Sequence, residues 1–307
     1  MFLSKARFVR LNPYIGFALL AGSAALLAAG APFMKIWFYS FAWWSFILAL
    51  DGLNYRRSGS SLLFDTVPDF LFAAFISVPV WLLFELFNLR LRNWSYHHPQ
   101  PGLAVRWLEY FIAFATVIPA LKVLAVFFQG VFKDIKWKIG HLTVNPALLD
   151  LSAGIGILFF VLSLAWPRLF FPLIWLGFFF LLEPVNYRRQ WPSFLRDLET
   201  GRASRTLSWL ASGLAAGFLW ELFNFWAGAH WEYHIPYLNF GRIFQMPVFG
   251  YAGFIPFALE IFAISSFMSA FYGKIKGKFV PRFAFWSGLL AFDLASFYLI
   301  DLITLVR

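Results

Sequence analysis

The sequence predicts an all-α polytopic membrane protein, and three observations support this class. Hydrophobic residues make up 61% of the 307 residues and charged residues only 13%, whereas a soluble domain has about 25% charged residues. Apolar runs of about 20 residues, the length that spans a bilayer as a helix, recur along the whole chain. Polar motifs around these runs occur twice in the same order, which indicates an internal repeat.

The apolar runs predict about nine transmembrane helices, and no stretch shows the alternation of a membrane barrel. The expected spans are residues 13–30, 36–53, 67–89, 107–129, 147–166, 168–185, 206–228, 248–271 and 284–305. The first run follows basic residues and resembles a signal peptide. We predict a retained helix instead, because Asn12-Pro13 before it matches Asn145-Pro146 before the fifth run.

The predicted repeat unit has four helices. Asn54-Tyr55-Arg56-Arg57 returns as Asn186-Tyr187-Arg188-Arg189, and Ile118-Pro119 returns as Ile255-Pro256. An even number of helices brings the chain back to its starting side, so the two units are parallel and their pseudo-two-fold axis follows the membrane normal. The expected organisation is a first repeat at 1–130, a cytoplasmic surface linker at 131–144, a second repeat at 145–272, and a basic loop with a ninth helix at 273–307.

The charge distribution predicts the orientation. Lys and Arg concentrate at the N-terminus and in every second loop, which places the N-terminus in the cytoplasm and the C-terminus outside, in a membrane of the bacterial inner type. The net charge of +10 therefore points to membrane lipids as partners, not to nucleic acid. The chain has no Cys, which excludes disulfides and thiolate catalysis.

The central motif is Glu85-Leu-Phe-Asn88 followed by Trp94-Ser-Tyr96-His97, and it returns from Glu221 to His234. Residues three apart share a helix face, so each Glu and Asn lie together at the outer end of their helix. The duplication predicts one polar site around the pseudo-axis, in which two close carboxyl groups keep a proton available for acid–base chemistry. The candidate catalytic residues are Glu85, Asn88, Tyr96, His97, Glu221, Asn224, Tyr233 and His234.

Two other interpretations of this motif stay open. Imidazole and carboxylate together suit Zn, Fe or Mn, so Glu85, His97, Glu221 and His234 are candidate ligands for a divalent metal, the one cofactor that the sequence suggests. Alternatively, Trp-x-Tyr-His-x-Pro is a turn at the membrane interface, and the Glu and Asn only tie that turn to its helix.

Two arginine pairs lie at the predicted cytoplasmic ends of helices: Arg56, Arg57, Arg188 and Arg189. They are candidates for binding lipid phosphate or a pyrophosphate head. Alternatively, they are topological anchors. Asp51 and Glu183 precede them at helix C-termini, where an acid is unfavourable, so the arginines are the expected partners of these carboxylates.

Lys122 and Glu260 are the deepest charges of the predicted bundle and follow the repeated Ile-Pro at nearly equivalent places. They are expected to form a buried ion pair across the pseudo-axis, with Asp293 as a rival partner for Lys122. Such a pair either fixes how the halves dock or relays protons.

Three functions follow from these motifs. The first is an intramembrane enzyme that acts on a lipid or isoprenoid at the outer face, with Phe-rich walls around an apolar chain. The second is a proton-coupled secondary transporter that uses Lys122 and Glu260. The third is a structural or accessory subunit with protein partners in a larger membrane complex. Phosphate loops, dinucleotide fingerprints and HExxH are missing from the sequence, so no standard motif selects among the three.

Overall fold

The computed structural model describes residues 5–133, 143–201, 203–237 and 239–306. Most of the predicted linker at 131–144 lies outside the described residues. The main helices are α1 (Lys5–Ala28), α2 (Pro32–Ser58), α3 (Val67–Leu91), α4 (Leu103–Phe114), α5 (Val117–Phe132), α6 (Pro146–Ala165), α8 (Ile174–Arg188), α10 (Ser204–Trp226), α11 (Tyr251–Ile275) and α12 (Phe279–Leu299). Shorter elements are β1 (Trp94–His97), α7 (Pro167–Phe170), η1 (Phe171–Leu173), α9 (Phe194–Glu199), β2 (His230–Tyr233), β3 (Arg242–Ile243), β4 (Met246–Pro247), η2 (Val248–Gly250) and a π-helical end, η3 (Ile300–Thr304).

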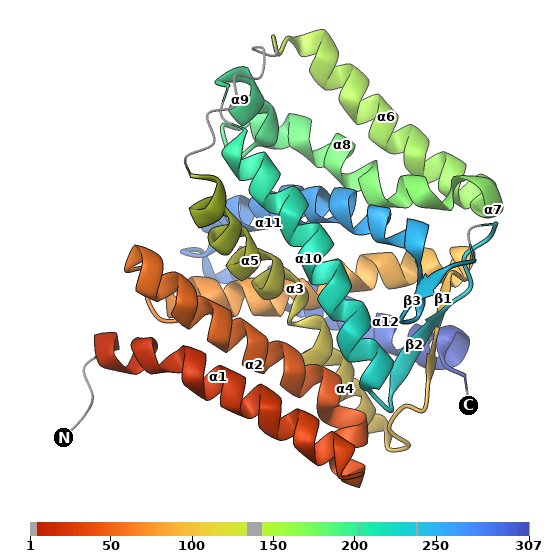
Figure 1. Cartoon of the computed structure of the whole chain (residues 1–307). Helices are drawn as coiled ribbons and strands as arrows, with labels where there is room; N and C mark the ends of the chain where they lie inside the picture. The colour runs from red at the N-terminus through yellow and green to blue at the C-terminus, as the bar shows by residue number, and fades with distance from the viewer. Residues whose placement is uncertain (1–4, 134–142, 202, 238, 307) are drawn as a thin grey trace.

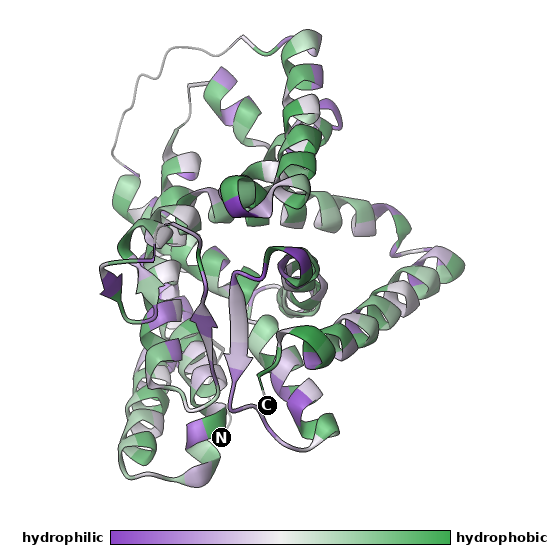
Figure 2. Ribbon diagram, turned by 90° about the vertical axis from the view of Figure 1, so that its right-hand side faces the viewer, coloured by the Kyte–Doolittle hydropathy of each residue, from purple (hydrophilic) through white to green (hydrophobic). Residues whose placement is uncertain are grey.

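Nine helical segments of the described chain are long and apolar enough to cross a membrane, so the prediction of a multi-pass helical membrane protein is confirmed. Large apolar side chains such as Leu151, Leu169 and Phe283 are exposed on their surfaces, as expected for helices that face lipid. In Figure 2 the helical ribbons are mainly hydrophobic, and hydrophilic colour gathers on the strands and near helix ends.

The first helix begins earlier than predicted. α1 starts at Lys5 and contains Pro13, so Asn12-Pro13 does not open this helix. The ring of Pro13 lies against Gly52 of α2, where a Cβ atom would collide with it; close packing of this kind makes proline tolerable inside a membrane helix. At the matching place Asn145 does cap α6, because its side chain accepts a hydrogen bond of 2.8 Å from the N–H of Leu148.

The fourth span is broken into α4 and α5. A side chain from α3 satisfies backbone groups at the break: Ser77 Oγ donates to the carbonyl of Phe114 at 2.6 Å and accepts from the N–H of Ile118 at 3.1 Å. This compensation is what a helix break inside a bilayer requires. In contrast, α11 continues through Pro256.

The bundle is held by close helix pairs. α1 packs along α2, α6 packs along α8, and α10 lies between α5 and α11 at the centre (Figure 1). Gly213 and Gly217 of α10 face Phe254 of α11 so closely that a Cβ atom at either position would collide with it. These small residues therefore set the separation of the two central helices.

One end of the bundle carries the strands, and we call it the strand end. β1 and β2 form an antiparallel pair in which Trp94 lies opposite Tyr233 and His97 opposite His230. The backbone N–H of Val306, near the C-terminus, bonds to the carbonyl of Tyr96 at 2.9 Å. Figure 1 shows the strands and the C-terminus at this end, with the N-terminus and α9 at the other. Four-residue strands are too short for a pattern of alternation, so no strand is predicted here from the sequence.

Candidate functional site

The two copies of the Trp-x-Tyr motif meet in the ribbon formed by β1 and β2. Side chains alternate across a strand, so Trp94, Tyr96, Trp231 and Tyr233 share one face. Ser95, Glu232, His97 and His230 share the opposite face. The ribbon thus has an aromatic face turned to the bundle and a polar face turned away from it.

Glu85 accepts hydrogen bonds from three aromatic side chains. Its side chain is fully buried in α3. The Oε1 atom accepts hydrogen bonds from the indoles of Trp81 and Trp94 at 3.0 Å each and from the hydroxyl of Tyr96 at 2.5 Å. The Oε2 atom has no hydrogen-bond partner among the residues that the structure describes. Because donors to a carboxylate form strong hydrogen bonds, Glu85 fixes the positions of these rings.

Glu221 of α10 occupies the corresponding position in the second copy and accepts fewer hydrogen bonds. It is also fully buried, and its Oε1 atom accepts a hydrogen bond of 2.8 Å from the hydroxyl of Tyr233. Its Oε2 atom lacks a partner as well. The two carboxyl groups are therefore bound to the rings of their own motif copies, and no hydrogen bond joins one to the other.

Asn88 and Asn224 tie each strand to the preceding helix. Asn88 Oδ1 accepts from the N–H of Asn93 at 2.8 Å, and its Nδ2 donates to the carbonyl of Trp94 at 2.9 Å. Asn224 bonds in the same manner to both backbone groups of Trp231, at 2.9 Å each. This geometry matches the interpretation in which the asparagines hold a turn, and it leaves their amide groups fully engaged.

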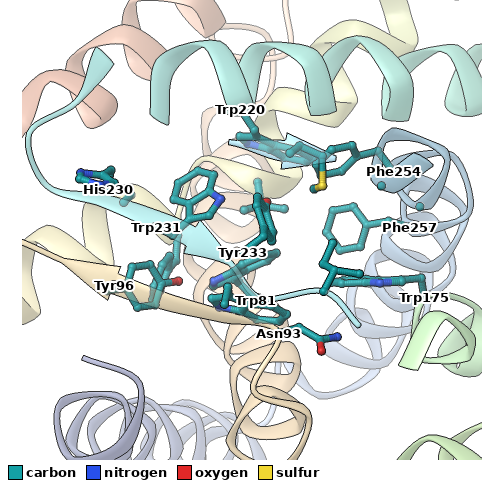
Figure 3. A pocket seen from close by; sticks show the side chains of 18 of the residues that line it. Trp81, Asn93, Tyr96, Trp175, Trp220, His230, Trp231, Tyr233, Phe254 and Phe257 are labelled. Atoms are coloured by element: carbon teal, nitrogen blue, oxygen red, sulfur yellow. The ribbon is translucent and has the colours of Figure 1, made fainter. Parts of the chain in front are cut away.

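A cavity of about 410 Å³ lies beneath the ribbon, between the two halves of the chain. This volume falls within the range of small-molecule sites, about 300–1,000 Å³. Figure 3 shows rings from α3, α8, α10, α11 and both strands pointing toward one space. The aromatic lining residues are Tyr39, Trp81, Trp94, Tyr96, Tyr110, Phe114, Phe171, Trp175, Trp220, Trp231, Tyr233, Phe249, Phe254 and Phe257.

The aromatic wall is continuous. The ring centroids of Trp81 and Trp94 are 6.0 Å apart, and those of Trp94 and Trp175 are 6.1 Å apart. Burial raises the pKa of Tyr96 and Tyr233 well above the usual range, and the adjacent carboxyl groups raise it further. Both phenols therefore stay protonated and act as donors toward Glu85 and Glu221.

Histidines gather on the polar face of the ribbon. The rings of His97 and His230 stack with centroids 5.7 Å apart, and Ser95 Oγ lies 3.1 Å from His97 Nε2 and 2.9 Å from His234 Nε2. His97 Nε2 is 3.8 Å from Glu232 Oε2. Burial lowers the pKa of His97, although Glu232 opposes this shift. His97 and His230 also reach the edge of the cavity.

The structure does not assemble the predicted metal ligands. Glu85 and Glu221 lie beneath the ribbon and bond to aromatic donors, whereas His97 and His234 lie on its polar face. Across the described residues, no group of three or more His, Asp or Glu side chains is arranged to hold a metal ion. The strand pairing separates the two residue types, because it turns alternate side chains to opposite faces.

Lys122 and Glu260 do not form the predicted ion pair. Glu260 is fully buried, and its Oε1 atom accepts a hydrogen bond of 2.7 Å from the N–H of Phe178 near the N-terminal end of α8. Lys122 has Asp69, in the first turn of α3, as its acidic neighbour. Backbone groups thus replace the expected partner of Glu260.

The arginines do not pair with Asp51 and Glu183. Asp51 accepts hydrogen bonds from Ser61 Oγ at 2.5 Å and from the N–H of Leu62 at 2.7 Å. Glu183 accepts from Ser193 Oγ at 2.6 Å and from the N–H of Leu195 at 2.9 Å. Each acid therefore closes the loop that follows its helix, and this set of donors compensates its unfavourable place at a helix C-terminus.

The four arginines lie exposed at the end of the bundle that carries the N-terminus. Arg56 donates to the carbonyl of Arg10 and lies over the ring of Tyr14. Arg57 lies over Phe127, and Arg188 pairs with exposed Asp150 at 2.5 Å. They are distant along the helices from the cavity at the strand end, so the two features are separate sites.

Sequence reasoning missed two acidic residues beside the cavity. Asp301 of η3 forms a bidentate pair with Arg106 of α4, at 2.6 and 2.9 Å, and also accepts from Trp107 and Tyr110. Glu109 of α4 lines the cavity itself. The available signal was an acid inside an otherwise apolar run, which marks functional positions in membrane helices.

Comparison with known protein families, with characterised proteins and with solved structures gives no match, so the function is argued from the site itself.

Proposed function

We propose that this membrane protein binds an apolar lipid or isoprenoid in the cavity beneath the ribbon and acts on it there. The single observation that carries the proposal is the cavity of about 410 Å³, which both halves of the chain enclose with aromatic side chains. Rings of this kind complement hydrocarbon chains and double bonds, and they present little polar surface that a chain would have to desolvate.

The chemical step is assigned to two Tyr–Glu pairs. Tyr96 and Tyr233 line the cavity, whereas Glu85 and Glu221 lie behind them and accept their hydroxyl protons in hydrogen bonds. In this arrangement the tyrosines touch the substrate, and the carboxyl groups supply or take up a proton through them. His97 stands at the edge of the cavity, where it can exchange protons with solvent. Asn88, Asn224 and His234 hold the ribbon in place.

The proposal includes the internal repeat. Three pairs of matched residues make matched bonds: Glu85 and Glu221 to a Tyr, Asn88 and Asn224 to a strand, and Asp51 and Glu183 to a Ser. The strand register is also symmetric, because Trp94 lies opposite Tyr233 and Tyr96 opposite Trp231. A two-fold axis through the ribbon exchanges these two pairs, which supports a pseudo-axis along the membrane normal.

We further propose that the strand end faces outward from a bacterial-type inner membrane and the N-terminus faces the cytoplasm. The excess of Lys and Arg in the N-terminal segment and alternate loops supports this orientation. Arg56, Arg57, Arg188 and Arg189 then lie where they meet the phosphates of the cytoplasmic leaflet. The transporter interpretation loses its main support, because Glu260 bonds to the N–H of Phe178 and not to Lys122.

Filling the cavity tests the binding step. Gly253 lines the cavity, and a Cβ atom there would meet nothing closer than 3.8 Å, so Gly253→Leu adds volume inside the site without a backbone clash. We expect this variant to lose the apolar molecules that co-purify with the wild-type protein, as measured by mass spectrometry of organic extracts. Gly154→Leu is the matched control, because Gly154 has no neighbour within 4 Å of the added atom. Equal extracts from all three proteins would reject the binding site.

The catalytic step is tested separately by Glu85→Gln combined with Glu221→Gln. The amides keep the size of the side chains but cannot take up a proton. We expect bound apolar molecules to remain while the lipid and pigment profile of the membrane shifts toward unconverted substrate. An unchanged profile at normal protein levels would remove the enzyme assignment and leave the binding site intact.

A further inference from the structure

The cavity wall does not share the basic character of the chain, whose net charge is +10. The carboxyl group of Glu109 lines the cavity, and no Lys or Arg of the described chain does so. At the edge of the cavity, burial lowers the pKa of His97 and so favours its neutral form. A phosphate or pyrophosphate head placed here would meet an acidic side chain and no Lys or Arg of the described chain, which is unfavourable in a low-dielectric site.

Glu109 has no hydrogen-bond or ion-pair partner within the described residues. Its nearest basic group is Arg106, on the same helix. Arg106 is already occupied by Asp301, whose carboxylate holds the guanidinium at 2.6 Å, and by the carbonyl of Gln100 at 2.7 Å. Glu109 is therefore a half-buried carboxyl group at the cavity whose basic neighbour, Arg106, is already paired with Asp301, and such groups in membranes call for a further partner.

The aromatic rings around the cavity also favour a cation over an anion. The faces of indole and phenol rings carry negative electrostatic potential and attract cations, most strongly for Trp. Trp81, Trp220 and Trp231 approach the cavity from three different elements (Figure 3), whereas the ring of Trp175 stacks on those of Phe84 and Trp94. Behind the wall, Glu85 and Glu221 have no Lys or Arg partner in the described chain. In the described chain, no Lys or Arg side chain beside these rings therefore cancels the negative potential of their faces.

We propose that the cavity receives the alkylated ammonium group of its ligand, with Glu109 as counter-ion and the tryptophan faces as a cage. The ligand class is an organic cation on an apolar chain. This inference rests on the proposed function, which supplies the apolar chain of the ligand, and it adds the charge of the ligand's head group. Quaternary ammonium recognition by aromatic cages follows the same physics: the ion keeps no hydrogen-bonded water, so ring faces replace its hydration at little cost.

The test compares two probes of equal shape on the full protein in lipid nanodiscs, by isothermal titration calorimetry. The first probe is hexyltrimethylammonium, and the second is its neutral isostere, in which carbon replaces nitrogen. We expect the cation to bind about ten-fold more tightly than the isostere, and hexyl phosphate to bind more weakly than both. Equal binding of cation and isostere would overturn this inference and leave the apolar site standing. Loss of binding for both probes would reject the apolar site together with it.

Two variants locate the effect. Glu109→Gln is expected to remove most of the preference for the cation while the isostere binds as before, because only the charge changes. Asp150→Asn is the matched control, since Asp150 is an exposed acid on α6, outside the cavity lining. If Glu109→Gln folds poorly, Trp231→Leu provides the second variant, and it should lower cation affinity more than isostere affinity. A preference that survives in both variants would contradict the proposed cage.

Discussion

The two halves of the chain carry corresponding polar residues, but these residues form more hydrogen bonds in the first half than in the second. In the first half Glu85 holds two indoles and a phenol, and Arg106 is locked to Asp301. In the second half Glu221 holds one phenol. Arg242, which follows the second motif copy as Arg106 follows the first, is exposed and within the described residues bonds to Asn239 and a backbone carbonyl. Side-chain bonds thus fasten the first half of the cavity wall more firmly than the second.

We expect the largest difference in stability between variants of Arg106 and Arg242. Arg106→Ala leaves Asp301 buried without its counter-charge, so we expect a loss of about 3–5 kcal/mol in the free energy of unfolding. Arg242→Ala removes an exposed side chain and should change it by less than about 0.5 kcal/mol. Unfolding in detergent, followed by tryptophan fluorescence, measures both.

A double variant separates the charge effect from loss of packing. Arg106→Met combined with Asp301→Leu removes both charges and keeps apolar volume, so it should be more stable than Arg106→Ala alone. Equal losses for Arg106→Ala and Arg242→Ala would show that the first half is not the more firmly fastened one.

We expect the next largest difference in stability between variants of Glu85 and Glu221. Glu85→Ala leaves three buried donors without an acceptor, and Glu221→Ala leaves one. At about 1–3 kcal/mol for each unsatisfied donor, the first variant should be less stable than the second by about 2 kcal/mol or more. Thermal unfolding compares them, with Glu232→Ala on the polar face as a control. The same loss for both variants would mean that the extra indole bonds of Glu85 add nothing.

The sequence predicts what depends on local composition and misses what depends on distant partners. Nine spans follow from hydropathy alone, and the repeated motifs place Glu85, Tyr96, Glu221 and Tyr233 at one end of the bundle. The partner of a buried charge comes from tertiary contact. Glu260 finds the N–H of Phe178 rather than Lys122, and no pattern in the sequence reveals this. The ribbon is missed for a related reason, since strands of four residues exist only because each copy pairs with the other.

The smallest predicted effect concerns pH at the ribbon. Burial lowers the pKa of His97 below its usual value of about 6.5, so the unfolded state binds a proton more readily than the folded state. Stability should then rise with pH between this lowered pKa and about 6.5, and acidification through the same window should weaken the ribbon. Glu232 faces the same imidazole and opposes this shift, whereas the neighbouring His230, His98 and His234 add to it. We expect His97→Gln to flatten the dependence of the unfolding temperature on pH in this window. His98→Gln, at an exposed position of the same turn, should change it less, because His98 acts on this dependence only through the imidazole of His97. The reverse result would assign the effect to another histidine of the cluster.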